Sequence, residues 1–299
     1  MIQKNYMCAA LYMLGAYTLW VGNDVFSKLS GETLSVPQRA FINQFVATLI
    51  LVFLFSRKQG WQAFKTRKPW FHVGRGILCC INLMAIYCAV TYMTLANFYT
   101  IAFTLPFLIA IISAIVLKEH PSVGVWAAIV IGFFGVIVAV RPTSYDPVSW
   151  PLLGIVSMFA ANLSFAFYVL TIKWGGKNET VAALTVYPVA ISALISLADI
   201  AILGNWVWNP AAIIYMSLTG LFFAAAIILV TRAYQLASNA FVASFHYSQI
   251  ITGGLAGFFI WHDIPARNVV LGAAIIIAAG LLIIRNGDKA KEQAFEAAS

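Results

Sequence analysis

The hydrophobic residues of this chain come in ten long blocks, separated by short stretches of polar and charged residues. The blocks cover residues 6–27, 37–56, 70–90, 97–117, 122–140, 149–172, 181–203, 209–231, 239–261 and 268–284, and they are 17 to 24 residues long. A helix needs about 20 apolar residues to cross the hydrocarbon core of a bilayer. Because a helix satisfies its own backbone hydrogen bonds in lipid, the pattern predicts an all-α integral membrane protein with ten transmembrane helices.

The two halves of the chain share a sparse set of residues at nearly constant spacing. The first half has Tyr92, Asn97, Phe103, Glu119 and Arg141, and the second half has Tyr234, Asn239, Phe245, Asp263 and Arg285. Corresponding positions are 142 to 144 residues apart. We therefore predict two five-helix repeats, at residues 1–141 and 142–285, followed by a cytoplasmic tail at 286–299.

The number of spans in each repeat decides how the repeats are related. Five is odd, so the second copy enters the membrane from the opposite side, and the two copies form an inverted repeat. Such halves can exchange conformations, which opens the protein first to one side and then to the other. This arrangement predicts alternating access. The alternative is that the repeat is an old duplication, kept only because the two halves pack well together.

Composition and charge place almost the whole chain in the membrane. Hydrophobic residues make up 62% of it and charged residues only 9%, too few to keep a soluble protein of this length hydrated. If the N-terminus is cytoplasmic, 13 lysines and arginines lie on the inner side and four on the outer side. Positive charge marks the cytoplasmic side, so we expect a multi-pass protein of the cell inner membrane with both termini inside. The net charge of +8 then reports topology and not a nucleic-acid partner.

Sequence motifs argue against two other classes of membrane protein. An intramembrane enzyme would need a catalytic motif, and the chain has no G-x-S-x-G, no H-E-x-x-H and no Walker A sequence. A channel would need rings of charge or a filter loop, and neither is evident. No cysteine or histidine spacing suits a metal, and no cofactor is expected. A secondary carrier of a small organic solute is the leading interpretation.

Short motifs in the expected order carry a resemblance to a known family. They are Trp20-x-Gly22, Lys28, Arg75-Gly76, Tyr92-x-x-Leu95-Ala96-Asn97, Phe103, Pro106, Glu119, Trp126-Ala127-Ala128, Gly132-Phe133-x-Gly135-Val136 and Arg141-Pro142. The chain resembles the EamA-type carriers of the drug/metabolite transporter superfamily, and among them it is most similar to the S-adenosylmethionine uptake group.

The resemblance implies a central cavity, lined chiefly by spans 1, 3, 4, 6, 8 and 9. Carriers of this type move metabolites, amino acids or drug-like amines, so the implied partners are a small-molecule substrate and membrane lipid. Spans 5 and 10 are implied to pack at the ends of the molecule. They would support a homodimer through the last helix of each repeat, and the alternative is a monomer.

Polar and aromatic residues inside the spans are the candidates for binding a substrate, because a polar group in lipid is costly unless it has a function. The predicted substrate-binding residues are Tyr17, Trp20, Asp24, Arg75, Asn82, Thr100, Thr104, Tyr168, His246 and Gln249. The aromatic ones could hold a cation or a planar ring by π contact. Asp24 and His246 are also the titratable groups best placed for proton coupling.

Each candidate also has a structural interpretation. Asp24 could be hydrated near the outer interface, and Arg75 could extend its charge to the inner one. The threonines could bond to their own helix backbone, and Asn82 could bridge two helices. Gly253-x-x-x-Gly257 reads as a close helix-packing motif, and Pro106 and Pro188 should bend their helices.

Overall fold

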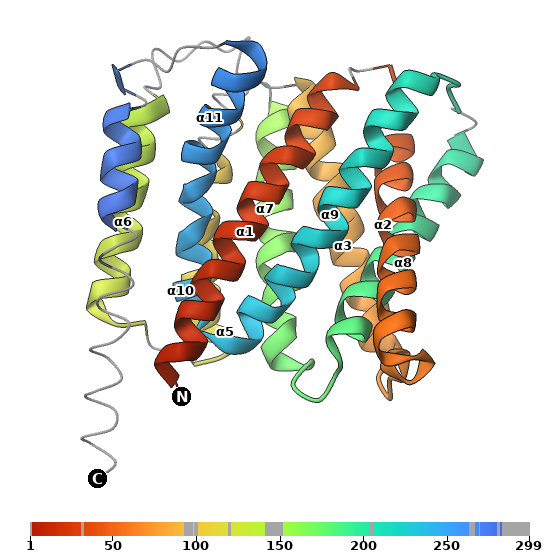
Figure 1. Ribbon diagram of the computed structural model, residues 1–299, viewed down its shortest axis with the longest axis horizontal. Helices are drawn as coiled ribbons and strands as arrows, with labels where there is room; N and C mark the ends of the chain where they lie inside the picture. The colour runs from red at the N-terminus through yellow and green to blue at the C-terminus, as the bar shows by residue number, and fades with distance from the viewer. Residues whose placement is uncertain are drawn as a thin grey trace.

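The computed structural model describes residues 2–30, 33–92, 98, 101–118, 121–140, 152–203, 206–262, 267–268, 270–279 and 282 of the 299-residue chain. Within these ranges every regular element is a helix. The long helices run up and down side by side, with α6 at one edge of the molecule and α2 and α8 at the other (Figure 1).

Each of the ten predicted blocks contains a helix. In chain order the α-helices are α1 (Ile2–Leu29), α2 (Val36–Gln59), α3 (Pro69–Tyr92), α5 (Leu105–Val116), α6 (Val123–Val140), α7 (Leu152–Trp174), α8 (Val181–Leu203), α9 (Pro210–Leu236), α10 (Asn239–Ser244), α11 (Gln249–Trp261) and Val270–Ala279. Short 3-10 helices, η1 (Trp61–Phe64) and η2 (Phe245–Ser248), precede α3 and join α10 to α11. Among the described helices, α2, α3, α7, α8 and α9 are long and apolar enough to cross a membrane.

Prolines mark where several helices begin. Pro37, Pro106 and Pro210 lie in the first turns of α2, α5 and α9, where a missing N–H costs no helical hydrogen bond. Asn209 adds a side-chain cap to α9, because its oxygen accepts from the N–H of Ala212 at 3.2 Å. The apolar pattern therefore sets helix length, and these local signals set the ends.

The predicted bend at Pro106 is present as a break. A turn at Phe103 and Thr104 separates helical residues 101–102 from α5. Pro106 has no N–H to offer the carbonyl of Ala102, four residues earlier. The side chain of Asn162 on α7 donates to the carbonyls of Ala102 (3.4 Å) and Ile101 (2.8 Å) instead. The break is therefore satisfied from a neighbouring helix.

The helices pack as matched pairs. α1 lies along α9, and α3 lies along α7. α8 packs against both α2 and α3, and α2 also packs against α9. Small residues allow close approach: a Cβ at Gly22 would lie 2.7 Å from the ring of Phe222, and one at Gly76 would lie 2.5 Å from Ile191. These contacts bring α1, α3, α7 and α9 around the middle of the molecule.

Candidate functional site

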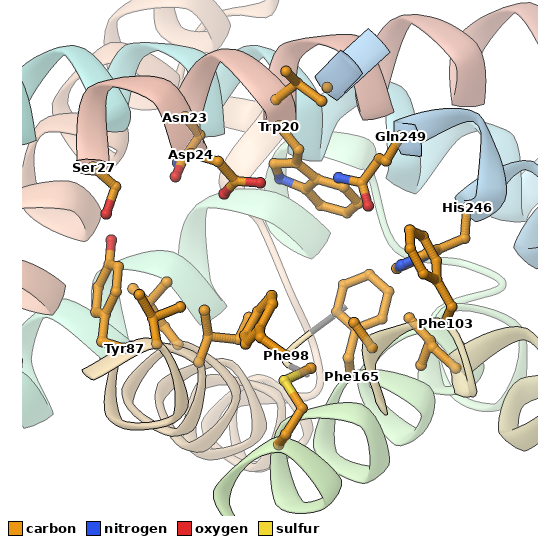
Figure 2. A pocket seen from close by; sticks show the side chains of 18 of the residues that line it. Trp20, Asn23, Asp24, Ser27, Tyr87, Phe98, Phe103, Phe165, His246 and Gln249 are labelled. Carbon is orange, nitrogen blue, oxygen red and sulfur yellow. The ribbon is translucent and has the colours of Figure 1, made fainter. Parts of the chain in front are cut away.

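A cavity of about 860 Å³ lies in the middle of the bundle, between α1, α3, the described part of span 4 up to the start of α5, α7, α9 and the η2–α11 segment. Figure 2 shows side chains converging on it from opposite walls. Polar side chains of the lining include Asn23, Asp24, Ser27, Arg39, Asn82 and Gln249, and aromatic ones include Trp20, Tyr87, Phe98, Phe103 and Phe165. The lining residues come from spans 1, 3, 4, 6, 8 and 9, as the resemblance implied, with Arg39 added from span 2 and Asn268 from the start of span 10.

One face of α1 forms a wall of this cavity. Trp20, Asn23, Asp24 and Ser27 recur at intervals of three and four residues, which places them on one side of a helix. The amide of Asn23 donates to the carbonyl of Thr219 on α9 at 3.2 Å and fixes this wall in place. Trp20 and Asp24 extend into the cavity beside Gln249 of α11 (Figure 2).

The cavity is open at one end and closed at the other. Along α1, Asp24 and Lys28 are exposed, whereas Tyr17, two turns earlier, is fully buried. His246 lies at the closed end of the lining, with its ring 5.0 Å from Tyr17 and 5.4 Å from Phe103. These three rings form a floor beneath the cavity.

The wall near this floor is aromatic. The Trp20 indole lies 5.6 Å from the ring of Phe165, and Phe165 stacks on Tyr168 at 6.2 Å. Such faces attract cations and planar rings. The cavity therefore joins an aromatic region near the floor to a charged region at the open end, where Asp24 and Arg39 lie.

Six of the predicted residues line the cavity: Trp20, Asp24, Asn82, Tyr168, His246 and Gln249. Two of them also have structural contacts. Asn82 donates to the carbonyl of Ala161 on α7 at 2.9 Å, so it bridges two helices as well. Tyr168 is only 2% exposed and stacks under the guanidinium of Arg75 at 4.2 Å. A substrate-binding role for the six stays a prediction.

Three of the other predicted residues, Tyr17, Arg75 and Thr104, are described by the structure and do not line the cavity in this conformation. Tyr17 is fully buried in the floor and does not line the cavity. Thr104 donates to the carbonyl of Ile101 at 2.8 Å and accepts from Asn162 at 3.1 Å. Thr100 lies outside the described residues. Their proposed contacts with substrate remain predictions.

Arg75 is a buried cross-link between helices. It is 1% exposed, and it donates to the Tyr168 carbonyl (2.8 Å), to the Thr171 hydroxyl and to the Leu184 carbonyl (3.1 Å). Pro188 has no N–H for the Leu184 carbonyl, so Arg75 satisfies that group from α3. In this conformation the arginine holds α7 and α8 together and does not reach the interface.

The glycines of α11 also depart from expectation. Gly253-x-x-x-Gly257 suggested close packing between helices, but both glycines line the cavity, and a Cβ at Gly253 would meet nothing within 4 Å. This prediction was wrong at Gly253, because the motif reports only small side chains and not what lies opposite them. Here the missing side chain widens the cavity.

Sequence reasoning missed several lining residues. Arg39 is one of the four basic residues assigned above to the outer side, although it lies one turn inside α2 and is 4% exposed. Tyr87, Phe98 and Phe165 gave no signal, because aromatic residues are common throughout such spans. Asn162 could have been found, since the break expected at Pro106 requires a donor nearby.

Four contacts close the end of the molecule beneath the floor, and we call them the closure contacts. They join η1 and the start of α3 to the α7–α8 connection and the start of α8. In order they are Lys68 Nζ to the Gly175 carbonyl (2.8 Å), His72 Nε2 to Glu179 Oε2 (3.2 Å), the Thr180 hydroxyl to the Ala63 carbonyl (2.5 Å) and the Tyr187 hydroxyl to the Phe64 carbonyl (2.6 Å). Within the described residues, this end is tied together by side chains and not by packing alone.

Comparison with known proteins places the chain in a group of transporters. The model of the EamA-like transporter family matches residues 7–141. The S-adenosylmethionine uptake transporter of Rickettsia prowazekii is 25% identical over 299 residues, with 98% of each chain covered. The riboflavin transporter of Rhizobium johnstonii is 30% identical, with 78% of each chain covered. The pseudopaline exporter CntI of Pseudomonas aeruginosa is 25% identical, with 92% of this chain and 95% of that one covered.

The fold is also known from experiment. A solved crystal structure of a protein superposes with a TM-score of 0.77 at 15% identity, and the match covers 92% of this chain and 95% of that chain. At this identity the likeness concerns the fold alone. The family match and the relatives above show that this multi-pass membrane protein is a transporter of small metabolites, and that the chain belongs to the EamA-like transporter family.

Proposed function

We propose that this protein is a secondary carrier of a cationic or zwitterionic metabolite with a planar body, such as S-adenosylmethionine. The observation that carries the proposal is the cavity itself, which places the exposed carboxylate of Asp24 above a wall built from Trp20 and Phe165. Its volume of about 860 Å³ suits a metabolite of that size. The similarity to S-adenosylmethionine uptake transporters supports the same choice.

The magnitudes are sufficient for a carrier. A cation over an aromatic face gains about 0.5–2 kcal/mol, and a hydrogen bond to a charged group gains about 1.5–3 kcal/mol. Two aromatic contacts and the Asp24 carboxylate together support millimolar to micromolar binding, for which about −4 to −8 kcal/mol is needed. Tighter binding would slow release on the other side of the membrane.

We infer that transport proceeds by alternating access between two inverted five-helix repeats, residues 1–141 and 142–285. Exchanging the repeats would turn the α1–α9 contact into the α7–α3 contact, and the α2–α9 contact into the α8–α3 contact. Both members of each pair are present in the packing. This correspondence supports a twofold relation between the halves.

The orientation follows from charge. With both termini in the cytoplasm of the inner membrane, the closure contacts face the cytoplasm and the exposed Asp24 faces outward. The described conformation would then be open to the outside. The direction of net transport is not fixed by this state, so export of amino acids or drug-like amines is the alternative within the same family.

The oligomeric state rests on one edge of the molecule. There α6 packs closely against the helix Val270–Ala279: a Cβ added at Gly135 would lie only 3.0 Å from the Gly272 carbonyl. Phe134 and Leu271 are exposed on this edge. A homodimer would form here, and a single species of monomer mass in native mass spectrometry would instead establish a monomer.

Uptake by proteoliposomes tests the proposed function. Labelled S-adenosylmethionine should enter with saturable kinetics and exchange against unlabelled substrate inside, as a carrier does and a channel or an enzyme does not. Asp24→Asn should weaken uptake about tenfold or more, since the amide oxygen can still accept a hydrogen bond but the negative charge that pairs with the cation is lost. The matched control is Asp199→Asn, because Asp199 lies on α8 outside the cavity lining. Riboflavin in the same assay separates a cationic from a neutral planar substrate, and transport of riboflavin alone would refute the proposal.

A further inference from the structure

The two buried arginines of the described residues are held in different ways. Arg75, 1% exposed, donates to three acceptors on α7 and α8. Arg39, 4% exposed, donates from Nη2 to the hydroxyl of Ser27 at 3.0 Å, and its Nε has no hydrogen-bond partner. Within the described part of the chain, no carboxylate forms an ion pair with Arg39.

A buried cation without a counter-ion is costly in a membrane protein. A guanidinium carries five N–H donors in a planar fork, a geometry that matches carboxylate and phosphate oxygens. Arg39 lines the cavity, and its guanidinium lies 4.7 Å from the centre of the Tyr87 ring. The stacking and the bond to Ser27 keep the side chain in a fixed position while other donors remain unused. An oxyanion that enters the cavity would complete this site.

The position of Arg39 relative to Asp24 suggests which oxyanion is bound. Ser27, which holds Arg39, follows Asp24 by three residues on the same face of α1, a rise of about 4.5 Å along the helix. Asp24 and the residue that holds the Arg39 guanidinium are therefore on successive turns of α1 at the open end. In an α-amino acid the ammonium and the carboxylate are bonded to the same carbon, and with a hydrogen bond of about 2.9 Å at each end the head group can bridge two side chains that lie farther apart than its own charged groups.

We propose that Arg39 is the subsite for the substrate's carboxylate and that it selects α-amino acids over amines of the same shape. Asp24 accepts from the ammonium group, and the body of the substrate lies against Trp20 and Phe165. This assignment rests on the proposed function and narrows its substrate class to zwitterions. Ser27 is a positioning residue, because it acts through Arg39.

A matched pair of ligands tests the assignment. Binding of S-adenosylmethionine and of its decarboxylated analogue is measured by isothermal titration on purified wild-type protein, Arg39→Gln and Arg39→Lys. The wild type should bind the ligand that has the carboxylate about tenfold or more tightly than the decarboxylated one, because only the first forms a hydrogen bond between charged groups with Arg39. Arg39→Gln should bind both forms equally, and Arg39→Lys should keep part of the preference. Arg232→Gln, which removes an exposed arginine outside the cavity lining, should match the wild type.

Two results would overturn the assignment: equal binding of the two ligands by the wild type, or an unchanged preference in Arg39→Gln. Arg39→Lys protects the test against misfolding, because it retains the charge, and each variant is first checked for a single peak in size-exclusion chromatography. Failure of the wild type to bind either ligand would instead count against the proposed cargo.

In that case a second measurement decides the role of Arg39 without any cargo. A cysteine is placed at Val90, on the cavity wall one turn beyond Tyr87, after the four native cysteines are replaced. The rates of reaction with an anionic and a cationic methanethiosulfonate are compared. Removal of Arg39 should lower the anionic-to-cationic rate ratio by at least about threefold. An unchanged ratio would show that this arginine does not present its charge to the cavity.

Discussion

Breaking the hydrogen bond between His72 and Glu179 should open the closed end of the transporter. The two side chains are 1% and 6% exposed and join the start of α3 to the residues just before α8. Glu179→Ala removes the acceptor and leaves His72 buried, with Nδ1 already lacking a partner. An unsatisfied buried polar group costs about 1–3 kcal/mol. That cost falls on the closed state alone, because water can reach both ring nitrogens of His72 once this end opens.

The population shift follows from that value. A loss of about 2 kcal/mol changes an equilibrium by a factor of about 30. A closed state favoured by about 99 to 1 would then be favoured by only about 3 to 1. One quarter of the molecules would be open at this end, a fraction that spectroscopy detects.

Double electron–electron resonance measures this fraction. Spin labels at Lys65 and Lys177 lie on the two exposed connections at the closed end, and they should show a second, longer distance in Glu179→Ala. Lys173→Ala is the matched control. It removes a charge from the last turn of α7, at the closed end of the molecule, and Lys173 takes part in none of the four closure contacts. A single unchanged distance in Glu179→Ala, in a protein that still transports, would refute the view that this pair holds the closed state.

Three further predictions test the floor, the broken helix and the topology. His246→Ala should weaken substrate binding a few-fold, by about 0.5–1.5 kcal/mol for one hydrogen bond, without loss of folded protein, and normal transport would make His246 a packing residue. Asn162→Ala should lower the melting temperature, because two carbonyls lose their donor, and Asn162→Asp should not rescue it, since a carboxylate cannot donate. Reporter fusions at Ser299 and near Lys65 should both report cytoplasm, and an external signal at either would overturn the orientation.

The fold was largely predictable from the chain, because lipid imposes a strong rule. A spanning segment must be helical and about 20 residues long, so ten apolar blocks gave ten helical segments. The interruptions were harder to predict. Pro106 indicated the break before α5, but no proline marks η2 between α10 and α11. The repeat could be inferred only through its spacing, and it stays a proposal supported by matched packing.

The candidate site was predictable in its polar residues and not in its shape. Asp24 and Gln249 were found because polar side chains are costly in lipid. Arg39 was missed, because the high cost of a charge in lipid leads one to place a charged residue near the end of a span at the membrane interface. Burial of that charge depends on Tyr87 and Ser27, which come from other helical positions, and no local pattern reports such a contact.

Two polar residues show why cost in lipid is an incomplete guide to function. Pro106 and Pro188 each free one backbone carbonyl, and in each case a side chain from another helix donates to it. Asn162 satisfies Ala102, and Arg75 satisfies Leu184. Both donors are buried and polar, and Arg75 was predicted to bind the substrate for that reason alone. A proline four residues after the accepting carbonyl identifies the other role, and candidates left after such pairs are removed, Asp24 and Arg39 among them, have the stronger claim on the substrate.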